Sequence, residues 1–287
     1  MKGVAKAVGQ TPLEALREYG VATGRPDVRR SYAGRLDPMA EGLLAVLEEE
    51  ACDGQAEAQH STKRYAWELL LGVSSDSFDV LGLLRGEEGG WAAEERPSVR
   101  QVTEEQAAEA ARVLDEETAG RRRQAYPPFS SARVRGHPLF WWAQQGRLNE
   151  VQIPQVEVEV TESKAGCVRW ESPGRVLAQV IARVGLVNGQ GFRQERICAR
   201  WRMALADLPD SFRFAIVTAR CAVSSGTYMR SLAEETGRRV GCGGLAWSIC
   251  RTQVGETLSL LDAFPLRPVS KELFEKVWRL LKQRGLI

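Results

Sequence analysis

The sequence predicts an α+β fold in which a mixed, mostly antiparallel sheet is flanked by helices and loops. Apolar and polar residues alternate in segments such as 156–160 and 212–221, which is typical of strands. Helical signals lie in separate segments rather than between every pair of strands, which disfavours a regular βαβ array. No linker, internal repeat or low-complexity tract divides the chain, so we expect one extended unit.

Two helices carry recognisable start signals. Segment 11–14 reads Thr-Pro-Leu-Glu, which combines an N-cap, a proline at the first helical position and a capping box, and Gly20 is expected to end this helix. Segment 103–106 reads Thr-Glu-Glu-Gln, a second capping box, which predicts a helix to about Leu114.

The other elements follow from apolar spacing and turn residues. Tyr65 to Val73 is rich in branched and aromatic residues, which favours a strand. The remaining predicted elements are helices at 39–47, 139–145, 228–240 and 273–281, and a strand at 176–181.

Composition excludes several classes of protein. The 287 residues include 39 basic and 37 acidic side chains, a formal charge of +2, so nucleic-acid binding would need local clusters of charge. The six cysteines form no C-x-x-C pair and there are two histidines, so no metal site is predicted. No segment reaches the roughly 18 consecutive apolar residues of a membrane helix, and the N-terminus lacks the apolar core of a signal peptide.

The segment 33–44, which reads AGRLDPMAEGLL, places one carboxylate on a turn. Asp37 lies between two glycines and before Pro38, which biases it away from helical geometry, so we expect it at a fixed angle at the start of a helix. Asp and Pro are common turn formers, so a purely structural role is an alternative. A catalytic role would need a nearby cation, and Arg35 is a candidate close in sequence.

Basic residues accompany other informative residues in two further segments. Lys63, Arg64 and Tyr65 put two cations and an aromatic ring at the start of a strand, a combination that suits an unstacked base and its phosphate. Arg133 and Arg135 lie on one basic face that could meet a phosphate backbone. Each pattern is also compatible with solvated surface residues.

The segment 224–233 reads as a Ser/Gly turn followed by a helix. Thr227 or Ser225 would cap the helix, and Tyr228 and Arg230 would lie in its first turn. A cation at a helix N-terminus opposes the helix dipole. The position of Arg230 is therefore most easily explained by a buried anionic partner.

These four segments, in this order, resemble the TruB-type tRNA pseudouridine synthases over residues 8 to about 256. Segment 33–44 is similar to the family's nucleophile motif, and 63–79 to the motif that supplies its active-site tyrosine. Residues 124–136 resemble its Pro-Ser-Ala segment, and 226–230 its Gly-Thr-Tyr-x-Arg motif.

The resemblance implies a pseudouridine synthase catalytic fold for residues 1–256. Residues 257–287 would form a short C-terminal helical extension, without the separate RNA-binding domain that is usual in the family. The family works without a cofactor, so none is expected here, and no metal.

The resemblance also implies a role for each site residue. Asp37 would be the nucleophile, Tyr65 would stack on the target base and take part in removing its C5 proton, and Arg230 would pair with Asp37. Tyr228 and Ile249 would line the uracil pocket. The remaining substrate-binding candidates are Tyr32, Lys63, Arg64 and Arg133.

The sequence departs from the family pattern at several positions. Tyr32 stands where the family usually has a histidine that organises the extruded nucleotides, and an aromatic ring there could still stack on a base. Ser225 replaces a lysine, and Cys250 replaces an arginine, although Arg251 remains.

The implied activity is that of an RNA pseudouridine synthase, an isomerase that acts on a uridine flipped out of the RNA. The expected substrate is uridine 55 in the T-arm of tRNA, or a T-loop-like site in another RNA such as rRNA. The alternative is a catalytically idle RNA-binding or ribosome-assembly factor with the same fold. We expect no membrane association and a location in the cytoplasm or an organelle such as the mitochondrial matrix, and leave open a partner protein that supplies further RNA-binding surface.

Overall fold

The computed structural model describes residues 1–87 and 95–265. Its strands are β1 (Lys2–Lys6), β2 (Arg30–Ala33), β3 (Ala40–Glu48), β4 (Lys63–Leu71), β5 (Gly120–Ala125), β6 (Arg133–Val134), β7 (His137–Pro138), β8 (Gln155–Glu171), β9 (Phe214–Val223), β10 (Gly244–Val254), β11 (Leu258–Ser259) and β12 (Phe264–Pro265). Its α-helices are α1 (Pro12–Ala22), α2 (Gln55–Gln59), α3 (Glu104–Arg112), α4 (Leu139–Gln144), α5 (Pro173–Gly185), α6 (Gln194–Leu205) and α7 (Met229–Arg239).

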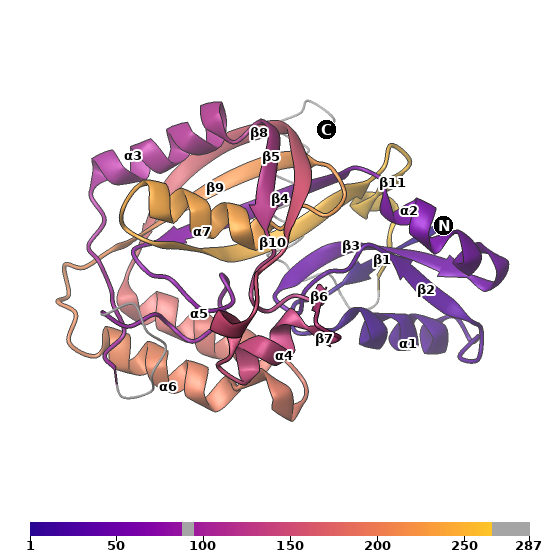
Figure 1. Cartoon of the computed structure of the whole chain (residues 1–287), viewed down its shortest axis with the longest axis horizontal. Coiled ribbons are helices and arrows are strands. Elements are labelled where there is room, and N and C mark those ends of the chain that lie inside the picture. Colours follow the sequence, from indigo (N-terminus) through magenta and orange to yellow (C-terminus); the bar gives the residue numbers. More distant parts are fainter. Residues whose placement is uncertain (88–94, 266–287) are drawn as a thin grey trace.

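One large sheet runs through the molecule (Figure 1). Its strand order is β12-β1-β3-β10-β4-β9-β8-β5, with β2 beside β3 and β11 beside β10. The pairs β1–β12 and β3–β10 are parallel and the other pairs are antiparallel. The predicted α+β class with a mixed, mostly antiparallel sheet is confirmed.

Helices cover both faces of the central strands (Figure 1). On one face, α3 and α7 pack on apolar side chains that include Trp67 and Leu69 of β4. On the other face, α5 and α6 pack on side chains that include Leu70 of the same strand. Successive strand residues point to opposite faces, so burial on both faces explains why β4 ends in an unbroken apolar run. A smaller cluster joins α1 to β1 and β3.

The predicted helix at 39–47 is wrong, because these residues form β3. The strand is buried on both sides, so its run of apolar residues lacks the alternation that identifies a strand. Gly42 adopts φ +100°, and a Cβ there would lie 2.4 Å from the carbonyl oxygen of Arg251. The close contact with β10 therefore requires glycine at this position.

The predicted strand at 176–181 is also wrong, because the segment lies within α5. Ser172 caps this helix, Pro173 starts it, and the buried residues Val176, Val180 and Val184 recur every four positions. The β-branched content of the segment favoured a strand, but packing of this apolar stripe against the sheet decided for a helix.

Several other boundaries follow the sequence. Both capping boxes are present, at Thr11 and Thr103, and the strand predicted from Tyr65 corresponds to β4. The first helix continues past Gly20 to Ala22, so the glycine does not end it. The predicted helix at 273–281 lies outside the described residues, and the described part of the tail forms β11, a short 3₁₀ turn and β12.

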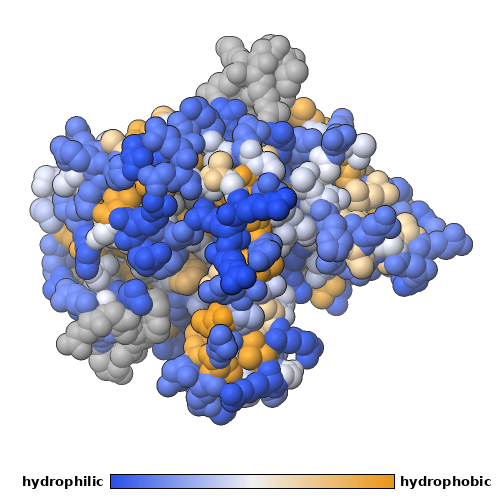
Figure 2. Space-filling view, turned by 45° about the horizontal axis from the view of Figure 1, so that its top comes forward, coloured by the Kyte–Doolittle hydropathy of each residue, from blue (hydrophilic) through white to orange (hydrophobic). Residues whose placement is uncertain are grey.

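The surface is largely hydrophilic on the face that Figure 2 shows, with hydrophobic side chains gathered in small patches. Within the described ranges, no helix combines the length and the apolar character needed to cross a bilayer.

Candidate active site

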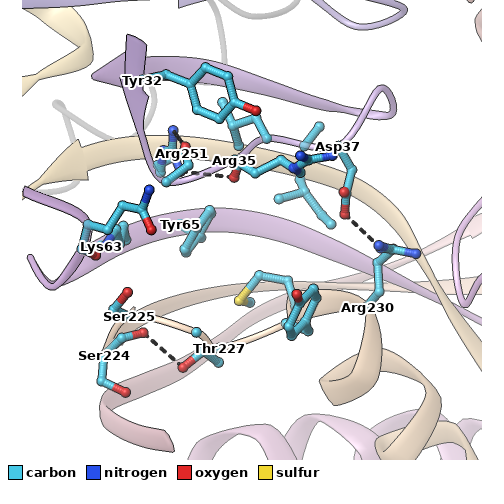
Figure 3. Close-up of a pocket in the computed structure, with 18 of the residues that line it drawn as sticks. Tyr32, Arg35, Asp37, Lys63, Tyr65, Ser224, Ser225, Thr227, Arg230 and Arg251 are labelled. Atoms are coloured by element: carbon cyan, nitrogen blue, oxygen red, sulfur yellow. Dashed lines mark hydrogen bonds and ion pairs between the residues drawn. The ribbon is translucent and has the colours of Figure 1, made fainter. Parts of the chain in front are cut away.

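Asp37 lies on the loop between β2 and β3, at the mouth of a cleft (Figure 3). Gly34 adopts φ +84° on this loop, and a Cβ there would lie 3.4 Å from Cε of Lys63. The amide of Ala40 donates to the carbonyl of Asp37 at 3.0 Å, where β3 begins. A strand rather than a helix therefore follows the loop, and the carboxylate, 27% exposed, remains accessible from the cleft.

Arg230 is the cation that faces Asp37. Its side chain is 3% exposed, and its Nε lies 2.8 Å from Oδ2 of Asp37 (Figure 3). Its Nη1 donates to the carbonyl of Ser77 at 2.8 Å and its Nη2 donates to the carbonyl of Phe129 at 3.2 Å. The guanidinium is thus held from several sides, which fixes the direction in which it meets the carboxylate.

A second carboxylate shares this arginine. Oδ2 of Asp79 lies 3.8 Å from Nε of Arg230, while its Oδ1 accepts from Oγ of Ser77 at 2.6 Å and from the amide of Leu81 at 3.0 Å. Burial raises the pKa of Asp79, and the charge of Arg230 opposes that rise. Burial lowers the pKa of Arg230, but Asp37 and Asp79 outweigh it and the net change is upward. Arg230 therefore stays cationic beside the carboxylate of Asp37.

Tyr228 forms one wall of the cleft and is the N-cap residue of α7. Its amide donates to Oε1 of Gln124 at 2.7 Å, and Nε2 of Gln124 donates to its carbonyl at 3.1 Å. Gln124 thus fixes the backbone of the N-cap residue. The prediction that Thr227 or Ser225 caps the helix is wrong, because no side chain among the described residues caps α7 and the hydroxyl of Thr227 donates to the carbonyl of Ser224 instead. Burial, and then the negative charge of Asp37, raise the pKa of Tyr228 to about 12, so its hydroxyl stays protonated at neutral pH.

Another part of the cleft wall comes from two adjacent strands. Tyr65 on β4 and Ile249 on β10 are 9% and 6% exposed, and both point to the face of the sheet that α7 covers. The register pairs Tyr65 with Arg251, so the wall is built by side chains from strands far apart in sequence.

Two buried cations lie at the far end of the cleft. Nζ of Lys63 donates to the carbonyls of Gln59 and Ser61. Arg251 donates from Nε to the carbonyl of Leu43 at 2.7 Å, and its Nη atoms donate to the carbonyls of Gly34 and Arg35. Burial, and then the nearby charge of Arg251, lower the pKa of Lys63 to about 8.

The cleft has a volume of about 460 Å³, and a second cavity of about 420 Å³ adjoins it. Both are lined by Asp37, Arg230 and Tyr228, so the ion pair lies where the two meet. Aromatic and aliphatic walls with a few charged groups are typical of sites that bind small molecules.

The structure brings most of the predicted residues together. The cleft is lined by Asp37, Tyr65, Arg230, Tyr228, Ile249, Tyr32 and Lys63. Two candidates do not line it. Arg64 pairs with Glu162 at 2.5 Å, and Arg133 is exposed on the β6–β7 hairpin, where its Nη1 donates to the carbonyl of Gly136.

Sequence reasoning did not assign Asp79, Gln124 or Arg251 to the site, because each acts through a contact distant in sequence. Arg35, considered only as a cation near Asp37, is exposed and lines both cavities. Among residues 1–87 and 95–265, no cluster of three or more His, Cys, Asp or Glu side chains is arranged to hold a metal ion.

Curated proteins are similar in sequence to this chain over most of its length. The tRNA pseudouridine synthase B of Nitratidesulfovibrio vulgaris strain Hildenborough is 30% identical over 222 residues, which are 77% of this chain and 53% of the relative. That of Thermosipho melanesiensis is 26% identical over 249 residues, which are 86% of this chain and 61% of the relative. The chain thus spans between about half and three-fifths of the length of these relatives.

A structural comparison gives the same fold. The crystal structure of a Cbf5-Nop10-Gar1 complex contains a chain that matches 99% of this one, with a TM-score of 0.51 and 16% sequence identity, over 56% of its own length. The family model described as TruB family pseudouridylate synthase (N terminal domain) matches residues 27–186, which include Asp37 and Tyr65. This chain therefore belongs to the TruB family of pseudouridylate synthases.

Proposed function

We propose that this chain isomerises a uridine in RNA to pseudouridine, with Asp37 as the nucleophile. The observation that carries the proposal is the pairing of a cleft-facing carboxylate with a buried arginine at 2.8 Å, between aromatic and aliphatic walls. Arg230 stabilises the negative charge of Asp37 and fixes its direction, which an attacking carboxylate needs.

The reaction rearranges bonds within one nucleotide. Asp37 attacks C1′ of the flipped-out uridine and forms an ester bond there, while the bond between N1 of the uracil and C1′ of the ribose breaks. The uracil rotates while the cleft encloses it, and C5 then bonds to C1′ as the ester bond breaks, which restores the carboxylate of Asp37. The C5 carbon loses its proton and N1 carries one in the product, so the composition of the nucleotide does not change.

The walls of the cleft hold the base during this rotation. We infer that Tyr65 stacks on the uracil and takes part in removing the C5 proton, while Tyr228 and Ile249 close the pocket. Tyr228 stays protonated at neutral pH, which suits a wall and a hydrogen-bond donor better than a base. Lys63, at the end of the cleft away from Asp37, and Tyr32 also line the cleft, and they would contact a phosphate and a neighbouring base.

The proposed substrate is uridine 55 of the tRNA T-arm or a T-loop-like site. The names of the relatives, tRNA pseudouridine synthase B, support tRNA as the substrate. A location in the cytoplasm or an organelle follows from that substrate. A partner protein that adds RNA-binding surface stays a prediction, as do RNA contacts of Arg64 and Arg133.

The idle-factor alternative is disfavoured by the site itself. A protein that only binds RNA has no chemical need for a buried arginine that faces both the cleft carboxylate of Asp37 and the buried carboxylate of Asp79, because such charged groups are costly to bury.

The test compares the wild type with Asp37→Asn on a T-arm stem-loop and on total cellular RNA, with pseudouridine measured by mass spectrometry. We expect the substitution to lower the rate at least about 10³-fold while the Kd for RNA changes by less than about threefold, because the nucleophile is lost and the phosphate contacts remain.

Asp53→Asn is the matched control, since Asp53 is an exposed carboxylate that pairs with Arg29. Substantial product from Asp37→Asn would refute the role of Asp37. If the wild type binds RNA but yields no product on any RNA, the idle-factor reading takes its place.

A further inference from the structure

Arg193 does not line the cleft of about 460 Å³, but it lines the adjoining cavity of about 420 Å³ together with Phe129. It precedes α6, and its backbone adopts φ +58°, in the left-handed region that residues other than glycine rarely occupy. Its side chain is 17% exposed and makes a two-point ion pair with Asp76, with Nη1 2.6 Å from Oδ2 and Nη2 3.1 Å from Oδ1. Its guanidinium also lies over the ring of Phe129, 4.3 Å from the centroid.

The ion pair with Asp76 connects Arg193 to the loop that supplies one of the two backbone carbonyls bonded to Arg230. Oδ1 of Asp76 also accepts from the amide of Leu83 at 2.9 Å, and the amide of Asp76 donates to the carbonyl of Leu83 at 3.0 Å, which closes the loop 76–83. The next residue, Ser77, supplies the carbonyl that accepts from Nη1 of Arg230. Arg193 therefore fixes the loop at the residue beside that carbonyl.

The contact with the ring of Phe129 connects Arg193 to the residue that supplies the other carbonyl bonded to Arg230. Phe129 accepts from Nη2 of Arg230 through its own carbonyl, while its ring packs under Arg193. Residues 126–129 have no regular secondary structure, so neighbouring strands do not fix this carbonyl by a ladder of hydrogen bonds. Both backbone acceptors of Arg230 thus belong to segments that Arg193 holds.

We propose that Arg193 is a positioning residue for the ion pair between Arg230 and Asp37. If Ser77 and Phe129 move, the guanidinium of Arg230 turns and its Nε no longer directs the carboxylate of Asp37. Small displacements of a reacting group produce large losses of rate. Arg193 is itself neutralised by Asp76, so its effect comes from geometry rather than from its field. This inference rests on the proposed function.

The kinetic test uses Arg193→Met, which keeps an apolar stem over Phe129 but removes the two-point contact with Asp76. We expect kcat to fall about 30-fold, with KM for RNA within about threefold, because Arg193 orients the reacting pair without contributing free charge to RNA binding. Thermal unfolding of each variant gives the folded fraction, and kcat is expressed per folded molecule.

Arg183→Met is the matched control on the neighbouring helix. Arg183 also donates to a backbone carbonyl, that of Trp247, and lies 5.4 Å over an aromatic ring, but these contacts do not lead to Arg230. We expect it to lower the unfolding temperature and to leave kcat per folded molecule within about twofold. An equal loss of kcat in the two variants would overturn the proposal.

A double-mutant cycle separates positioning from general stability. In an Arg230→Lys background the two carbonyls no longer hold a guanidinium, so adding Arg193→Met should change kcat by less than about threefold. A loss as large as in the wild-type background would mean that Arg193 acts elsewhere.

A second measurement, by NMR, does not require catalytic turnover. It can therefore test the role of Arg193 even if the proposed function is wrong. The ¹⁵N–¹H signal of Nε of Arg230 is assigned by its loss in Arg230→Lys. Arg193→Met should shift or broaden this signal, whereas Arg183→Met should leave it in place. An unchanged signal in Arg193→Met would overturn the proposal even if the protein proved inactive on every RNA.

Discussion

The two ends of the cleft both contain buried cations, but the charges of these cations are compensated differently. At one end, Arg230 faces the carboxylates of Asp37 and Asp79. At the other end, Lys63 and Arg251 are 5% and 1% exposed and donate to backbone carbonyls, and no ion pair joins either to a carboxylate in the described part of the chain.

This difference indicates that the two ends of the cleft bind different parts of the substrate. A buried cation that is paired with carboxylates leaves little net charge and serves mainly to orient them. A buried cation that contacts only carbonyls retains a positive potential, which favours an anion nearby. We therefore expect the uracil to lie toward Asp37 and a phosphate of the substrate toward Lys63.

The largest effect should come from breaking the acid-paired end. Arg230→Met should lower kcat at least about 10³-fold, because Asp37 loses the cation that orients it. It should also lower the free energy of unfolding by about 3–5 kcal/mol, since Asp79 remains buried without its partner. Single-turnover kinetics and urea unfolding measure the two effects.

Adding Asp79→Asn to this variant sharpens the result. The second substitution removes the unpaired buried carboxylate, so part of the lost unfolding free energy should return while kcat stays low. Recovery of turnover in the double variant would contradict an orienting role for Arg230.

An intermediate effect is expected at the carbonyl-lined end. Lys63→Met should raise KM for RNA about tenfold at pH 7 with kcat within about threefold, because a phosphate-attracting charge is lost and the nucleophile is untouched. Lys164→Met, which removes an exposed lysine paired with Asp115, is the control and should leave KM unchanged.

The pH dependence gives this prediction a sign. The ammonium of Lys63 loses its proton as pH rises through about 8, so KM of the wild type should increase between pH 7 and pH 9. Lys63→Arg keeps its charge over this range, so its KM should stay flat. A wild-type KM that is constant over the range would mean that Lys63 does not contact the substrate.

The smallest effects belong to the two arginines that lie away from the cleft. Arg133→Gln should weaken RNA binding by about two- to threefold and reduce the salt dependence of binding by about one charge, because Arg133 is exposed and its only partner within the described residues is the backbone carbonyl of Gly136. Arg64→Gln should change Kd by less than about twofold, since Arg64 already pairs with Glu162. The reverse order would place the RNA on the face that carries Arg64.

Site residues that belong to a recognisable sequence motif could be predicted more readily than residues that reach the site only through a contact in the folded chain. Asp37 and Arg230 were identified from segments far apart in the chain. The helix dipole indicated only that Arg230 needs an anionic partner, and the family resemblance implied that this partner is Asp37, the pair that the structure contains. Asp79 and Arg251 also make buried polar contacts at the site. These contacts could not be predicted, because sequence spacing does not show which carbonyl or carboxylate lies next to a side chain.

The fold shows a similar limit. The capping boxes at Thr11 and Thr103 predicted two helices because their hydrogen bonds are local. The buried strand β3 and the valine-rich helix α5 were misassigned because burial on both faces and packing against the sheet decide their structure.

The parallel pairing of β3 with β10 also bears on the biosynthesis of the protein. Ala40 lies beside Ile249 and Gly42 beside Arg251, so the strand that follows Asp37 is completed by a strand that is translated much later. Asp37 is translated before Arg230 and Arg251, which hold its loop. A nascent chain therefore has no assembled cleft until β10 inserts between β3 and β4, and assembly of the cleft marks the completion of this part of the sheet.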